Sequence, residues 1–206
     1  AAVSIGYAGL ESYGFHALET LQCMVERRTG GETGVAAVRC VEGEALWDWL
    51  DAHPTHAALA EAAAGAIGET TGPWDRVREI AEHPAAFLVQ YRDGLTAATL
   101  MLSGFCGAFA YAALVGGEQE ACEFVLQAGE PHGHFSYLSR NIEEMFLTGR
   151  PTYPAERTLL TTGILAAGME SRHDGNVWLP TPHLAVAYQP VERVPYRPAG
   201  PQPAGS

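Results

Sequence analysis

The middle of the chain contains four strand-like runs joined by short turns. These apolar runs cover residues 86–91, 95–102, 107–114 and 121–127, and each connection between them contains glycine. Short glycine-containing turns join antiparallel neighbours in a sheet. The block therefore predicts an antiparallel meander, and any fold for this chain has to accommodate it.

Segments with other apolar spacing precede and follow the meander. Apolar residues at helical spacing predict helices over residues 13–28, 42–52, 55–67, 135–148 and 155–170. Strands are predicted over residues 2–7 and 35–41, with a closing strand over 177–188 that is interrupted by prolines. Strands in one block, with helices on both sides of it in sequence, predict an α+β fold. We expect an open, predominantly antiparallel sheet with helices covering one face and the other face in contact with a partner.

The length and composition favour one domain with a tail. A chain of 206 residues, 47% of them hydrophobic, can form one sizeable core. We assign this domain to residues 1–188, and the proline-rich residues 189–206 are expected to be a disordered or strapped-on extension. The chain starts with Ala1 rather than Met and directly enters the predicted strand over residues 2–7, so we expect the natural protein to continue upstream.

The charge of the chain excludes several classes of function. Its formal net charge is -12, which repels nucleic acid and anionic membrane surfaces. No apolar run is long enough to span a bilayer. All twelve basic residues are arginine, so a Schiff-base lysine and a P-loop lysine are both excluded within this chain.

The cysteine pattern predicts a reducing compartment. Cys23, Cys40, Cys106 and Cys122 are widely spaced and form no Cys-x-x-Cys pair. We interpret them as reduced, mostly buried thiols, as in a cytoplasmic protein.

The predicted helix over residues 13–28 carries the most informative group of polar residues. His16 and Glu19 are three positions apart, so both side chains project from one face of the helix. A carboxylate beside an imidazole is an acid/base arrangement, and Ser12 is a candidate N-cap of the helix. The alternative is a structural role, in which His16 lies beside the core and a nearby glutamate accepts its hydrogen bond.

The stretch around His16 resembles the catalytic helix of the Gfo/Idh/MocA oxidoreductase family, usually written Asp-x-Gly-x-His-x-x-Asp. Gly14 and His16 match this pattern, Ser12 stands where the family usually has aspartate, and Glu19 replaces the second aspartate. The segment over residues 149–154, with the predicted helix that follows it, is similar to the last helical segment of the family.

The resemblance implies the C-terminal domain of such an enzyme. His16 is then the general acid/base, Glu19 its partner, and Ser12 and Tyr13 belong to the substrate-binding group. The implied substrate is a sugar, a cyclitol or a related polyol, and the implied assembly is a homo-oligomer through the open sheet face. NAD or NADP is bound by a Rossmann domain that is absent from this chain. The sequence has no Gly-x-Gly-x-x-Gly between a strand and a helix, so this chain alone is expected to hold no cofactor.

Three residues later in the sequence are further candidates for contact with the substrate. Under the resemblance, His134 lies near the substrate cleft. Arg157 and Tyr153 open the late helix with donors that suit a carboxylate or sugar hydroxyl groups. The alternative for Arg157 is an ion pair with Glu156 or with a surface acid.

Two other functions remain open at this point. The first is a free-standing, non-catalytic binding or scaffolding protein with the same fold, which the absent lysine and Ser12 both favour. The second is a metal-dependent lyase or hydrolase that uses His16 with His132 and His134, the pair for which Glu143 or Glu144 could supply oxygen. The metal signal is weak, and we predict no metal site.

Overall fold

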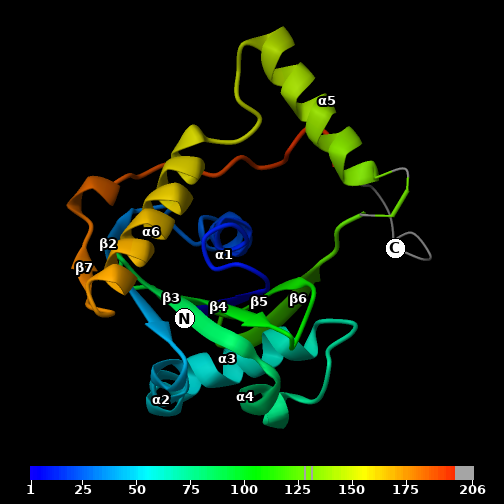
Figure 1. Cartoon of the computed structure of the whole chain (residues 1–206). Helices are drawn as coiled ribbons and strands as arrows, with labels where there is room; N and C mark the ends of the chain where they lie inside the picture. The colour runs from blue at the N-terminus through cyan, green and yellow to red at the C-terminus, as the bar shows by residue number, and fades with distance from the viewer. Residues whose placement is uncertain (128, 131, 198–206) are drawn as a thin grey trace.

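The computed structural model describes residues 1–127, 129–130 and 132–197 and confirms an α+β fold with an open, predominantly antiparallel sheet (Figure 1). The strands are β1 (Ala2–Gly6), β2 (Val35–Glu42), β3 (Glu82–Tyr91), β4 (Thr96–Ser103), β5 (Phe109–Val115), β6 (Glu118–Phe124) and β7 (Leu179–Pro180). The helices are α1 (Gly14–Val25), α2 (Glu44–Ala52), α3 (Pro54–Gly65), α4 (Val77–Ile80), α5 (Gly133–Thr148) and α6 (Ala155–His173), with short 3-10 turns η1 (Trp74–Arg76) and η2 (Pro182–Leu184).

The first strand divides the predicted meander. The sheet order is β6-β5-β1-β4-β3-β2-β7, so β1 lies between β4 and β5, parallel to the former and antiparallel to the latter. All five residues of β1 are buried, as expected for a central strand with both faces covered. The prediction of a continuous four-stranded meander was therefore wrong, although its two hairpins, β3-β4 and β5-β6, both form.

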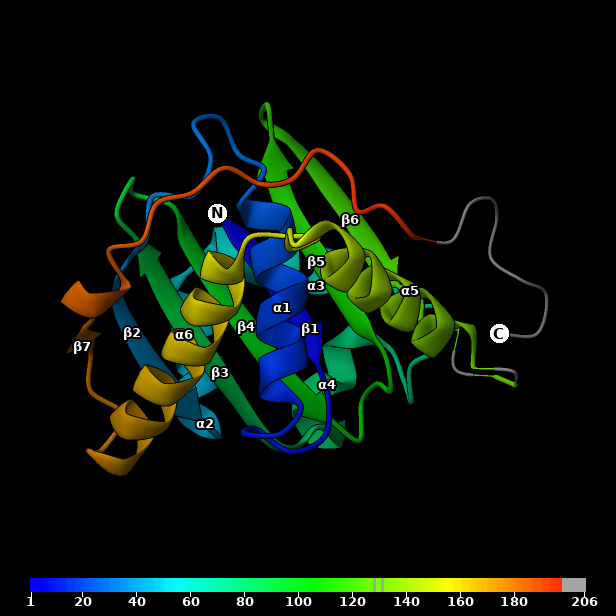
Figure 2. The ribbon, with the colours of Figure 1, turned by 90° about the horizontal axis from the view of Figure 1, so that it is seen from above.

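Helices cover both faces of the sheet, which corrects the prediction of one covered face. One core joins the sheet to α2 and α3, and a second core on the opposite face joins it to α1 and α6. Figure 2 shows α1 and α6 lying side by side across the strands. The physical reason is that β3 and β4 carry unbroken buried runs rather than alternating ones, so both faces of these strands need cover.

Two glycines set the position of α1 on the sheet. A Cβ atom on Gly6 would lie 2.7 Å from the Cβ of Ala17, and one on Gly14 would lie 2.9 Å from the ring of Phe87. The absence of these atoms lets the first turn of the helix approach β1 and β3 closely. The helix begins at Gly14, its N-cap residue is Tyr13, and no side chain caps it. The prediction that Ser12 is the N-cap was therefore wrong.

The predicted closing strand is reduced to the two residues of β7. Leu179 and Pro180 pair with β2, and a 3-10 turn follows at once because proline has no N–H group to continue a ladder. Beyond it the chain crosses toward α5, where Tyr196 exchanges two hydrogen bonds with Asn141. The described part of the tail is thus strapped to α5, and residues 198–206 of the predicted tail lie outside the described residues.

Helix α5 stands apart from the body of the domain (Figure 1). It contains no buried residue, and its large apolar side chains are exposed: Phe135, Leu138, Ile142, Met145, Phe146 and Leu147. No helix among the described residues is both long and apolar enough to cross a membrane.

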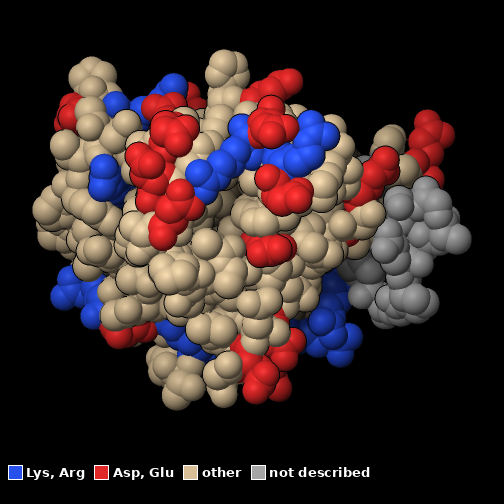
Figure 3. Space-filling model, turned by 90° about the horizontal axis from the view of Figure 1, so that it is seen from below, with Lys and Arg blue, Asp and Glu red and all other residues tan. Residues whose placement is uncertain are grey.

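The face covered by α2, α3 and α4 carries mixed charge. Acidic and arginine side chains are interspersed there, with broad uncharged areas between them (Figure 3). Two of the arginines are paired, Arg78 with Asp51 and Arg76 with Glu79. This face therefore lacks, among its described residues, the basic tract that nucleic-acid binding requires.

Candidate functional site

His16 lies on the exposed side of the first turn of α1. Its ring is surrounded by aromatic rings, with centroids 5.7 Å from Tyr13 and 6.2 Å from Phe109. The ring of Tyr7 adjoins both Tyr13 and Phe109, at 5.2 and 5.0 Å. No hydrogen bond or ion pair of the His16 side chain is formed with any described residue. The structure therefore presents an accessible imidazole at the edge of an aromatic ledge formed by Tyr7, Tyr13 and Phe109.

The position of Tyr7 in this ledge changes the pKa of its phenol group. Burial raises its pKa above the ordinary value, and the neighbouring Tyr13 and Cys106 act in the same direction. Tyr7 therefore stays protonated at neutral pH and can donate a hydrogen bond.

Glu19 does not contact His16 as the helical spacing suggested. Its carboxylate accepts a hydrogen bond of 2.6 Å from the Thr161 hydroxyl on α6. Burial raises the pKa of Glu19, while the hydrogen bond from Thr161 and the nearby charges of Arg157 and His16 oppose that shift. The two motif residues are coupled through their electric fields and not through a hydrogen bond.

Arg157 forms a buried ion pair that the sequence did not identify. Its Nε donates to the Glu26 carboxylate at 2.9 Å and a second donor, Nη2, binds the other oxygen, while the ring of Tyr153 lies 4.7 Å from the guanidinium carbon. The acceptor is neither Glu156 nor a surface acid, because the Glu26 side chain is fully buried. This pairing joins α1 to α6 and occupies the donors that were expected to meet a substrate.

The same ion pair belongs to a larger buried network. Tyr188 donates a hydrogen bond to Glu26 at 2.7 Å, and the Gln22 amide donates to Tyr188 and to Glu32. Tyr91 in turn donates to the Gln22 amide oxygen at 2.8 Å. The sequence carried one sign of this network: Gln22 and Glu26 are four positions apart on the buried side of α1, where apolar residues are expected.

The remaining candidates lie away from His16. His134 is in the first turn of α5, where its Nδ1 atom is 2.7 Å from the carbonyl oxygen of Gln127. Ser12 is exposed and lines a pocket with Leu10, Met169 and Arg172, and His16 is not among the lining residues of this pocket. Within the described part of the chain, no three potential metal ligands come together, at His132 and His134 or elsewhere.

The chain's own residues do not fit a dinucleotide of the Rossmann type. Such a site needs neighbouring parallel strands and a glycine-rich turn whose backbone approaches the pyrophosphate. Among the described strands only β1 and β4 run parallel, and Gly6 and Gly14 face Ala17 and Phe87 inside the domain. The described residues of this chain therefore form no Rossmann-type site for a dinucleotide.

Comparison of the chain with known protein families, with curated proteins and with solved structures finds no match. The family assignment therefore stays a prediction based on the residues around His16.

Proposed function

We propose that this chain is the C-terminal substrate-binding and catalytic part of an NAD(P)-dependent oxidoreductase of the Gfo/Idh/MocA type, with His16 as the general acid/base. The observation that supports the proposal is the accessible His16 ring, which has no hydrogen-bond partner among the described residues and lies against the aromatic ledge. An accessible imidazole beside aromatic rings is what a small-molecule site of this type requires.

The proposed substrate is a sugar, a cyclitol or a related polyol. Its apolar C–H face would lie on the exposed ring of Tyr13, which is close to parallel to the buried ring of Phe109 at an interplanar angle of 18°. One hydroxyl group would then face His16, which takes the hydroxyl proton and returns it in the reverse direction. Glu19 is a positioning residue in this scheme, because it reaches His16 only through its charge.

The nicotinamide cofactor, NAD or NADP, supplies the hydride chemistry when a separate nucleotide-binding domain holds it. The residues described above bind and orient the polyol and move its proton. They need no lysine for these roles.

The alternative is a free-standing binding or scaffolding protein with the same fold. The observation that favours it is the hydrogen bond from Thr161 to Glu19, which ties the motif carboxylate to α6 and away from the histidine. A binding module would keep the aromatic ledge and would not depend on proton transfer at His16.

The two functions differ in how they respond to pH. We propose NMR titrations of the chain, labelled at histidine and tyrosine, with myo-inositol, glucose and sorbitol. The enzyme proposal expects saturable shifts at His16 and Tyr13, and a dependence of the affinity on pH that His16→Gln removes. His183→Gln, which changes an exposed histidine on η2, is the matched control and should bind as the unmodified chain does. Binding that is equally strong in His16→Gln at every pH would support the binding module instead.

We also propose that the chain forms a homo-oligomer, through α5 instead of through the open sheet face predicted from the sequence. Helices cover both sheet faces, so the open-face interface has little unpartnered sheet to use, whereas α5 exposes a continuous apolar stripe. Phe146 and Leu147 are each 78% exposed, and such a patch is typical of a protein interface. In sedimentation velocity, the double substitution Phe146→Ser and Leu147→Ser should yield monomers where the unmodified chain forms dimers or larger species. A monomeric unmodified chain would contradict the oligomer.

A further inference from the structure

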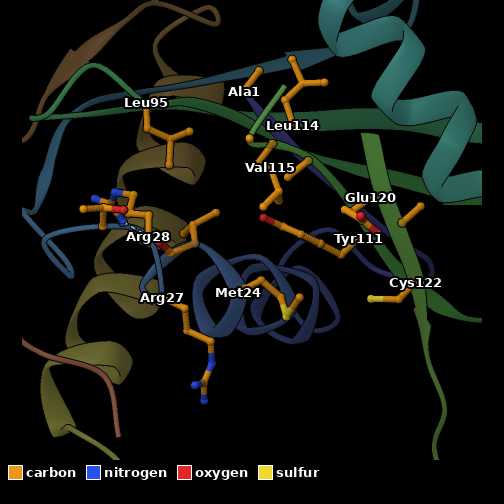
Figure 4. Close-up of a pocket in the computed structure, with 16 residues that line it drawn as sticks. Ala1, Met24, Arg27, Arg28, Leu95, Tyr111, Leu114, Val115, Glu120 and Cys122 are labelled. Carbon is orange, nitrogen blue, oxygen red and sulfur yellow. Dashed lines mark hydrogen bonds between the residues drawn. The ribbon is translucent and has the colours of Figure 1, made fainter. Parts of the chain in front are cut away.

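A cavity lies at the end of α1 that is remote from His16 along the helix. It has a volume of about 630 Å³ and opens between the last turn of α1 and the β5-β6 hairpin (Figure 4). Met24, Leu95, Ala113 and Leu114 contribute apolar walls. Figure 4 shows that residues from α1, β5 and β6 meet around this one space. Neither the motif nor the proposed function uses it.

The hydroxyl group of Tyr111 points into this cavity. The Tyr111 side chain extends from β5 across the space toward α1 (Figure 4), and the residue is only 7% exposed. Its hydroxyl forms no hydrogen bond with any described residue. Burial raises the pKa of Tyr111 to about 12, with further contributions from Cys23 and Cys122, so the hydroxyl is a donor throughout the physiological range. The hydroxyl oxygen is not enclosed by protein, since the only enclosed side-chain polar atom without a partner among the described residues is Asn176 Oδ1, so this donor is available to an acceptor that enters the cavity.

The two arginines at the end of α1 differ in their pairing. Arg28 donates to Glu32 and to Asp93, and these hydrogen bonds raise its pKa although burial opposes the charge. Arg27 lies at the rim of the same cavity, is exposed, and makes no ion pair or hydrogen bond among the described residues; its guanidinium extends away from the Tyr111 hydroxyl (Figure 4). Arg27 therefore keeps its positive charge available to an anion, whereas the charge of Arg28 is already paired.

The charge of one acidic side chain on β6, Glu120, bears on how a ligand would lie in the cavity. Glu120 pairs in the sheet with Ala113 and lines the cavity on the β6 side, away from Arg27 on α1. An anionic group is repelled from Glu120 and attracted to Arg27. The charges therefore favour a ligand whose acidic end faces α1.

We propose that this cavity binds a small apolar carboxylic acid. Its carboxylate accepts a hydrogen bond from the Tyr111 hydroxyl, and the positive charge of Arg27 at the rim attracts it from a longer distance. Its hydrocarbon part lies on Met24, Leu95 and Ala113. Charge-assisted hydrogen bonds of this kind are stronger than neutral ones, and the apolar walls provide the hydrophobic contribution to binding. This site is independent of the polyol site at His16.

The test uses octanoate as the probe and 1-octanol as its uncharged counterpart, in calorimetric titrations of the full chain. We expect saturable binding of one octanoate per chain, tighter than that of 1-octanol. Tyr111→Phe removes only the hydroxyl group and should weaken octanoate binding about tenfold. Arg27→Gln should weaken octanoate binding about threefold to fivefold and leave 1-octanol binding unchanged. Arg76→Gln, a change in η1 on the opposite face of the sheet, should bind both as the unmodified chain does.

Three results would overturn the proposal: no saturable octanoate binding at millimolar concentration, equal affinity for octanoate and 1-octanol, or unchanged octanoate affinity in both Tyr111→Phe and Arg27→Gln. Thermal unfolding of each variant establishes that it is folded. His16→Gln should bind octanoate normally, so a failure of the polyol site and a failure of this site are separate outcomes.

Discussion

The two ends of α1 carry similar residues in opposite settings. At the start of the helix, His16 is exposed and its ring has no hydrogen-bond partner among the described residues. Toward the other end of the helix, Gln22 and Glu26 are fully buried and bonded on several sides. A polar group that is already satisfied inside the protein holds the fold together, whereas one left accessible beside aromatic rings is available to a ligand.

The buried end is tolerated because its charges are paired. Removing a carboxylate and a guanidinium from water costs several kcal/mol for each ion, which only close pairing and further hydrogen bonds offset. Glu26 has both Arg157 and Tyr188, and Glu32 has Arg28 together with the backbone N–H groups of Thr33 and Gly34. The network therefore fixes α1 against α6 and against the chain near Tyr188.

The largest expected effect comes from breaking the buried ion pair. Glu26→Gln removes the charge that Arg157 needs and should lower the free energy of unfolding by about 3 to 5 kcal/mol, as measured by urea denaturation. Glu156→Gln is the matched control, because Glu156 is exposed in the first turn of α6 beside Arg157 in sequence. It should change the free energy by less than about 0.5 kcal/mol.

A double variant sharpens this first prediction. Replacing both partners, Glu26→Met with Arg157→Met, leaves no unpaired charge and should be less destabilising than Glu26→Gln alone. Equal stability of Glu26→Gln and Glu156→Gln would show that Glu26 is not the partner of Arg157.

A smaller effect, with a definite sign in pH, is expected at Glu19. Its pKa is raised in the folded protein, so folding strengthens proton binding at this carboxyl. The stabilising contribution is fully present below the ordinary pKa of glutamate, and it is lost as the pH rises through the raised pKa. Glu19→Gln should therefore gain stability relative to the unmodified chain as the pH rises from about 4 to about 7. We expect this change to be smaller than that caused by Glu26→Gln.

Unfolding curves of both proteins across that pH range provide the check. A stability difference that moves in the opposite direction would mean that the hydrogen bond from Thr161 outweighs the burial of Glu19.

Local features of the fold were predictable from the sequence, and long-range ones were not. The strand over residues 2–7, the first helix and the late helix were all confirmed, because each rests on apolar spacing within a short window. The insertion of β1 between β4 and β5 joins residues about a hundred positions apart in sequence. The turn residues that flank these strands do not indicate which distant strand will pair with them. Coverage of both sheet faces did have a local sign, the unbroken apolar runs of β3 and β4, which the prediction of one covered face did not take into account.

The candidate site divides in the same way. His16 was placed correctly on an early helix, since a helix of this length is a local feature. The partners of Glu19 and Arg157 are Thr161 and Glu26, each more than a hundred positions away in sequence, so spacing within one helix pointed to the wrong neighbours. The sequence did not predict the role of Tyr111 or its cavity, because a tyrosine within an apolar strand is expected to be part of the core.

The central claim is that the first turn of α1, which carries His16, binds the polyol substrate. A chemical-shift map of the chain titrated with myo-inositol tests this claim most directly. The account predicts saturable shifts at His16, Tyr13 and Phe109, with Gln22, Tyr91 and Tyr188 unmoved, and no loss of fold in His16→Gln. Shifts that avoid the first turn of α1, or a map that is identical in His16→Gln, would contradict it.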